Sequence, residues 1–225
     1  MTVLHLADEG EAADLAAFLS RLLHYDRAAA VRLQAAGTAL AVFGRPPSFE
    51  VLAIRAVRLG KPYENGLDVT LDVTVSVGEL LDGVDESAAT VAVPGAVTGP
   101  SWAGVLPPRG GWVPVGGLPA VDELRAMVAA GVAEFRARSE ELGAEGRTRA
   151  ELDRIGRDVW ARGVAETGLP VRVVHAAQAL GFLRGGDPVL FSSGPWLRLR
   201  TAYGSVAVRR GGVGVLGVSV RRGGA

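Results

Sequence analysis

Residues 31–42 read VRLQAAGTALAV, and residues 197–208 read LRLRTAYGSVAV. With one gap, Gly37 aligns with Gly204, and apolar residues alternate with other residues on both sides of the glycine. This pattern predicts two β-hairpins, and in the first of them Gly37 takes the turn position that needs a positive φ. An amphipathic helical segment precedes each hairpin, so we predict a repeated β-α-β-β unit.

The middle of the N-terminal half fits the same order of elements. Residues 67–77 alternate Leu or Val with Asp, Thr or Ser, which predicts a strand with one buried and one solvated face. A helical turn at 78–84 and a strand at 88–97 follow. Asp68 and Asp72 share the solvated face. We interpret them as surface residues, because a catalytic pair needs a third group and a pocket.

Two amphipathic helices interrupt this pattern. Residues 121–142 have helical apolar spacing, and a capping box at Thr148–Glu151 begins a second helix. We therefore predict three regions: an N-terminal α+β region at 1–117, a helical hairpin at 118–165, and a C-terminal α+β unit with basic strands at 166–225. The Pro- and Gly-rich segment 99–119 contains two tryptophans. We expect them to pack this loop on the core rather than to form an aromatic binding site.

The order of elements resembles that of the DNA polymerase sliding clamps, whose domains repeat a strand, a helix and antiparallel strands. The resemblance rests on residues 12–43, 73–84 (VTVSVGELLDGV) and 175–209. It implies a clamp-like α+β fold of antiparallel sheets, in which the helical hairpin is an insertion. Sliding clamps line a ring with basic helix faces, whereas the helix predicted at 12–25 carries Asp14. The resemblance therefore implies a partner-binding surface more readily than encircled DNA.

Composition excludes several classes of site. The 225 residues include no cysteine and three histidines, which excludes disulfides, zinc fingers, iron–sulfur clusters and thiol catalysis. All but one of the 24 basic residues are Arg, and Ala, Val and Gly are abundant, as in proteins from high-GC (actinobacterial-type) bacteria. The Arg preference is therefore no phosphate-binding signal in itself.

The net charge of zero conceals a gradient along the chain. Residues 1–100 carry a balance of −6, residues 101–187 a balance of 0, and residues 188–225 a balance of +6 with no acid. Two interpretations stay open. The basic end complements the acidic front within the fold or across an oligomer contact, or it binds nucleic acid or another acidic partner.

The basic end also contains the candidate contact site. A stripe of one aromatic residue and two guanidiniums on one strand face fits a stacked base or an acidic peptide, or else a charged edge strand that resists aggregation. The candidate partner or nucleic-acid contacts are Trp196, Arg198, Arg200, Tyr203, Arg209 and Arg210.

No catalytic constellation, metal site or cofactor site is predicted. Residues 212–217 match G-x-G-x-x-G, but neither a helix nor an acid about 20 residues further on follows, as a dinucleotide site requires. His5, His24 and His175 are interpreted as structural; His175 is the preferred candidate if one histidine has a function.

The N-terminus lacks the pattern of a signal peptide, and prolines interrupt the longest uncharged stretch, so we expect a cytoplasmic protein without membrane spans. The sequence favours a non-enzymatic interaction protein that binds a protein partner or itself. A nucleic-acid-associated protein using the same Arg residues, and an enzyme of unrecognised class, are the alternatives.

Overall fold

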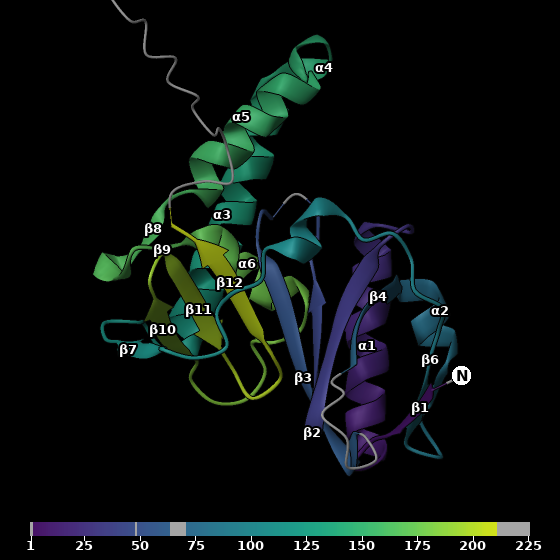
Figure 1. The fold of residues 1–225 in the computed structure, drawn as a ribbon. Coiled ribbons are helices and arrows are strands. Elements are labelled where there is room, and N and C mark those ends of the chain that lie inside the picture. The colour runs from purple at the N-terminus through teal and green to yellow at the C-terminus, as the bar shows by residue number, and fades with distance from the viewer. Residues whose placement is uncertain (1, 48, 64–70, 211–225) are drawn as a thin grey trace, which may run out of the picture.

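A seven-stranded sheet joins the two halves of the chain in the computed structural model, which describes residues 2–47, 49–63 and 71–210 (Figure 1). Every neighbouring pair of its strands is antiparallel. In spatial order the strands are β4 (Leu71–Ser76), β2 (Ala30–Gly44), β3 (Leu52–Tyr63), β12 (Ser205–Arg209), β11 (Trp196–Arg200), β10 (Val189–Ser193) and β7 (Val113–Val115). The halves meet where β3 pairs with β12.

The strand β2 corrects one prediction. The hairpin predicted around Gly37 is wrong, because residues 30–44 form one strand. Its first half pairs with β4 and its second half with β3, and the register shifts between Gly37 and Ala39. Gly37 has φ +56°, so its left-handed conformation makes a bulge here rather than a turn. The second predicted hairpin, β11–β12, is confirmed.

The alternating segment 67–77 is confirmed as a strand only from Leu71 to Ser76. Residues 67–70 lie outside the described residues, and Val77 already begins the helix α2 (Val77–Asp82). The side chain of Asp72 receives hydrogen bonds from Arg32 at 2.7 and 2.8 Å, which hold the pKa of that carboxyl below its usual value. Asp72 is thus engaged in a cross-strand ion pair.

Two helices cover one face of the sheet, called the inner face below. The helix α1 (Glu9–Tyr25) begins where the Asp8 carboxylate accepts a hydrogen bond from the Glu11 amide at 2.9 Å, and it packs on β3. The helix α6 (Val171–Ala179) packs on β12. Their apolar faces share one core with the inner-face strand residues, and Phe18 stacks on Phe182 at 5.6 Å.

A small sheet and a turn of helix complete the N-terminal half. Its strands, in spatial order, are β1 (Thr2–His5), β6 (Thr90–Val93) and β5 (Val84–Asp85). A bridge between Leu6 and Leu59 links this sheet to β3. The helix α2 packs on α1 and β6, so the small sheet adds its apolar side to the same core.

The predicted helical hairpin is confirmed. The helices α3 (Val121–Glu141) and α5 (Arg149–Trp160), joined through α4 (Gly143–Gly146), extend away from the sheets (Figure 1). A short ribbon of β8 (Gly163–Val164) and β9 (Leu169–Pro170), joined by η2 (Ala165–Thr167), leads back to α6. The α+β class with antiparallel sheets and an inserted hairpin is thereby confirmed. The division at residues 117 and 165 stays a prediction, and β7 pairs with the C-terminal strand β10.

The opposite, outer face of the sheet is partly covered by residues 99–112. The turn η1 (Ser101–Gly104) is held by Arg32, which donates a hydrogen bond to the carbonyl of Ala103. Trp102 packs against a second apolar cluster on this face, formed by Phe43, Ile54 and Ala207. The expectation that a tryptophan anchors this loop is therefore confirmed for Trp102. None of the described helices is long and apolar enough to cross a membrane.

Candidate binding surface on the C-terminal strands

The strand β11 divides its side chains between the two faces of the sheet. Leu197 and Leu199 are fully buried in the main core on the inner face. Trp196, Arg198 and Arg200 alternate with them and therefore lie on the outer face. The structure thus brings these three candidate residues together.

Trp196 contributes mainly to packing. It is half-buried against the second apolar cluster, beside Trp102 and Leu106. An indole held in this way has only part of its surface left for a ligand. We therefore assign the recognition chemistry of this face to the arginines.

Arg198 is the most unusual residue of the surface. Its guanidinium lies 5.7 Å from the centre of the Trp112 ring, and its buried Nε has no hydrogen-bond acceptor among the described residues. Burial lowers the pKa of the Arg198 guanidinium, and the charge of Arg200 lowers it further. The partly desolvated charge of Arg198 and the nearby like charge of Arg200 raise the free energy of the unliganded surface. A bound anion would lower this free energy.

Arg198 also lines a shallow groove of about 270 Å³ on the outer face. The groove floor is apolar and comes from β2 and β3, with Ala41, Phe43 and Ile54 at its centre. Pro107, Pro108 and Arg109 of the covering loop line it as well. The groove therefore combines an apolar floor with guanidinium groups, a pairing that suits a ligand with both apolar and acidic groups.

Tyr203 lies away from this surface. The guanidinium of Arg184 covers its ring at 4.2 Å, and its carbonyl oxygen accepts a hydrogen bond from Arg55 at 2.8 Å. The ring packs against the main core. Tyr203 is thus a structural residue of the β11–β12 turn, and the structure does not bring it to the arginines of β11.

Arg209 and Arg210 lie at the other end of the hairpin. Arg209 is exposed and pairs in register with Trp196, whereas the Arg210 amide donates to the Pro195 carbonyl at 2.6 Å. Both residues line a second pocket of about 250 Å³, together with Arg172 from α6. Arg172 was not among the predicted contacts, because the chain separates it from the strands by more than one element.

The acids of the N-terminal half are neutralised by other arginines. Arg55 pairs with Glu11 at 2.9 Å and Asp14 at 3.3 Å, and Arg58 also pairs with Glu11, at 2.9 Å. Arg184 takes a second oxygen of Asp14 at 3.0 Å. The strand arginines at 198, 200, 209 and 210 have no ion pair within the described part of the chain. Within the described residues, the arginines of β11 and β12 therefore do not pair with the acids of the N-terminal half, and their positive charge is unpaired.

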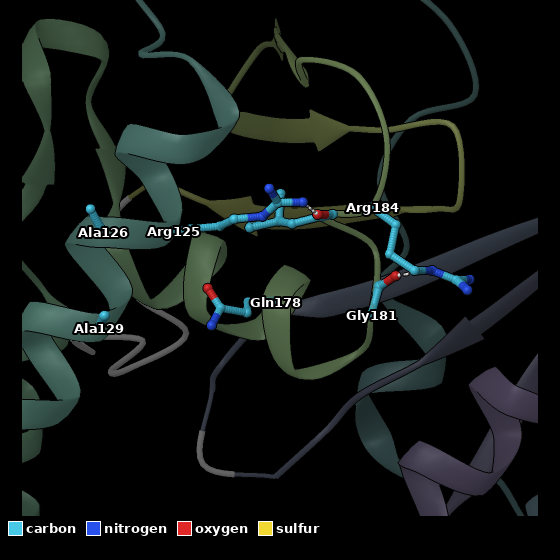
Figure 2. A pocket seen from close by; sticks show the side chains of 7 residues that line it. Arg125, Ala126, Ala129, Gln178, Gly181 and Arg184 are labelled. Atoms are coloured by element: carbon cyan, nitrogen blue, oxygen red, sulfur yellow. Dashed lines mark hydrogen bonds between the residues drawn. The ribbon is translucent and has the colours of Figure 1, made fainter.

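A larger pocket of about 450 Å³ lies between α3 and α6 (Figure 2). Its two charged residues already have partners. Arg125 pairs with Asp122 and donates to the Leu183 carbonyl, and Arg184 donates to the Gly181 carbonyl at 2.8 Å. Because these guanidiniums are satisfied, this pocket has less reason to hold an anion than the surface around Arg198.

His175 lies in a row of aromatic rings. Its imidazole is 4.2 Å from the Trp160 ring and 5.0 Å from the Phe49 ring, and Tyr25 stacks edge-on against Phe49. Burial lowers the pKa of His175. Among the described residues, no group of three or more His, Asp or Glu side chains is placed to hold a metal ion.

The lowered pKa of His175 predicts a loss of stability in acid. Below about pH 6.5 this histidine binds a proton in the unfolded chain, whereas in the folded protein the buried His175 binds one only at a lower pH. Protonation therefore stabilises the unfolded state, and the free energy of unfolding falls as the pH drops from about 7 to about 5. We expect His175→Phe to reduce this slope. Urea unfolding followed by circular dichroism at both pH values measures it, and an unchanged slope in the variant would contradict this origin.

Comparisons with known proteins give the following results. Residues 1–104 match the family model "Domain of unknown function (DUF8010)", and residues 107–213 match "Domain of unknown function (DUF8185)". No curated protein matches the chain.

Among solved structures, a DNA polymerase sliding clamp from Pseudomonas aeruginosa, crystallised with a ligand, is similar with 11% identity and a TM-score of 0.45. The match covers 92% of this chain and 64% of that chain, so the protein spans less than two thirds of the clamp's length. The resemblance expected from the order of elements is confirmed by this match. At this TM-score it carries no argument about function.

Proposed function

We propose that the protein is a non-enzymatic interaction protein that holds an acidic, partly apolar segment of a protein partner in the outer-face groove lined by β2, β3 and Arg198 of β11. The observation that supports this most directly is Arg198. Its guanidinium is partly desolvated, lies near Arg200, has no ion pair among the described residues and borders an apolar groove. A bound carboxylate relieves this cost and adds charge-assisted hydrogen bonds.

The groove favours a peptide over a nucleic acid. A phosphate backbone is held by a row of exposed cations. On the neighbouring strand β2, Arg32 is only partly exposed and is already bound to Asp72 of β4 at 2.7 Å. The apolar floor suits side chains such as Leu or Val next to the acid that meets Arg198.

Replacing Arg198 is the direct test. We expect a fluorescent peptide of alternating Glu and Leu residues to bind the wild-type protein, and Arg198→Gln to weaken binding by roughly tenfold, because a charge-assisted contact is lost. Fluorescence anisotropy measures both affinities. The control is Arg136→Gln, which removes an exposed arginine of α3 that lacks an ion pair in the described structure. Equal weakening by both variants would mean non-specific attraction and contradict the proposal.

Salt dependence separates the alternatives. A peptide held by Arg198 and Arg200 makes about two ionic contacts, so its affinity falls gently with salt concentration, whereas a nucleic-acid complex falls steeply. The nucleic-acid alternative would be favoured if a single-stranded oligonucleotide bound more strongly than the peptide and if Arg198→Gln reduced the dependence of that binding on salt concentration. Affinity purification with and without nuclease treatment tests the same distinction in cell extract, and sedimentation of the purified chain tests binding to a second copy.

A further inference from the structure

The second pocket lies where the end of β12 meets the ribbon β8–β9 and the start of α6. Its volume is about 250 Å³. Gly163, Gly168 and Pro170 line one part of it, and Arg172, Arg209 and Arg210 are its charged lining residues. These residues come from two separate segments of the chain, 161–172 and 208–210, so only the folded protein assembles the pocket.

The three guanidiniums lack acidic partners. Within the described residues none of them forms an ion pair, and the buried Nε of Arg172 has no hydrogen-bond acceptor. Among the described residues, the Arg210 side chain donates only to the carbonyl of Gly194, at 3.3 Å. Elsewhere in the described structure, arginines such as Arg32, Arg55 and Arg162 are paired with carboxylates. The pocket therefore concentrates positive charge that nothing on its own walls balances.

The N-terminal end of α6 adds to the positive electrostatic potential of the pocket. No side chain caps this helix, and its first turn contains no acidic residue. Its N-terminal residues, including Arg172, border the pocket. The positive end of the helix dipole therefore acts in the same direction as the guanidiniums.

We propose that this pocket binds the dianionic phosphate group of a small phosphorylated molecule. A phosphate monoester carries two charges and three terminal oxygens, which suit several guanidinium donors better than a single carboxylate does. The volume admits the phosphate and a few further atoms of the ester. This site shares no lining residue with the groove at Arg198, so the test of one proposal does not decide the other.

Titration with inorganic phosphate and with ribose 5-phosphate tests the site, followed by ¹H–¹⁵N NMR at constant ionic strength. We expect saturable shifts confined to the amides around the pocket, with Gly163 and Gly168 as reporters. Arg172→Gln and Arg209→Gln should each weaken binding by roughly tenfold, since each removes a charge-assisted contact. Arg172→Lys should retain part of the affinity, because the charge remains. Arg27→Gln, at an exposed position after α1, is the control.

The outcomes distinguish the sources of the phosphate. Tighter binding of ribose 5-phosphate assigns the site to a phosphate ester, and equal binding assigns it to the phosphate group alone. The proposal is overturned by the absence of saturable shifts, by equal shifts with chloride, or by full affinity in Arg172→Gln. Thermal unfolding of each variant shows whether the fold is intact; if Arg172→Gln unfolds, Arg209→Gln decides alone.

Discussion

Arg55→Met should destabilise the protein by about 1.5–3 kcal/mol, because it removes the charge-assisted hydrogen bonds between a buried guanidinium and the half-buried carboxylates of Glu11 and Asp14. Arg55 is 5% exposed, and its Nη2 lies 2.9 Å from Glu11 and 3.3 Å from Asp14. Its Nη1 donates to the carbonyl of Tyr203 at 2.8 Å. One side chain of β3 thus ties α1 to the turn between β11 and β12, so its loss affects both halves of the molecule.

Urea unfolding followed by circular dichroism measures this effect, and Arg58→Met is the matched control. Arg58 also binds Glu11 at 2.9 Å, but its side chain is 72% exposed and screened by solvent, so its loss should cost much less than the loss of Arg55. Replacing both partners, as in Arg55→Met with Glu11→Leu, should recover part of the loss, because the half-buried carboxylate that Arg55 bound is then removed as well. Equal costs for the Arg55 and Arg58 variants would refute the role given to Arg55.

Gly204→Ala should destabilise the protein by about 3 kcal/mol through overpacking. A Cβ at Gly204 would lie 2.6 Å from two ring carbons of Phe182, well inside van der Waals contact. Phe182 is 2% exposed and stacks on Phe18, so its ring has no free space into which to move. The added methyl group must therefore displace the turn or open the contact between the two rings.

Thermal unfolding provides the measurement, with an expected fall in Tm of roughly 6–12 °C. The control is Gly186→Ala, since a Cβ at Gly186 meets no atom within 4 Å. We expect the control to unfold within about 2 °C of the wild-type protein. If the Gly204→Ala protein were as stable as this control, the prediction would be wrong, because the turn could then move to accommodate the methyl group at little cost in stability.

Local patterns predicted the elements whose signals lie within one segment. The helix start predicted at Thr148 is confirmed by a hydrogen bond from the Glu151 amide to the Thr148 hydroxyl at 3.3 Å, although the Thr148 amide donates to the Gly146 carbonyl instead of closing the capping box. The alternation around Leu197 correctly placed Arg198 and Arg200 on one face of β11. Period-two and period-3.6 patterns report which face is buried, and burial of one face is what forms these elements.

The same patterns failed at Gly37. A glycine with positive φ suits both a hairpin turn and a bulge, so the local sequence leaves the two indistinguishable. The strand β4 pairs with the first half of β2 and β3 with the second half, and these partners keep the strand continuous. Gly204, which aligns with Gly37 in the sequence, instead lies in the turn between β11 and β12, beside the Phe182 ring and without a positive φ.

The sequence by itself determined the α+β class, the inserted helical hairpin, the absence of cysteine chemistry and the charge gradient along the chain. Only the tertiary structure decided which charges meet. It placed Arg55, Arg58 and Arg184 on the acids of α1, and it left Arg198, Arg209 and Arg172 without carboxylate partners among the described residues. The reason is physical: hydrophobic burial follows local periodicity, whereas a charge is paired or unpaired according to neighbours that lie far away in the chain.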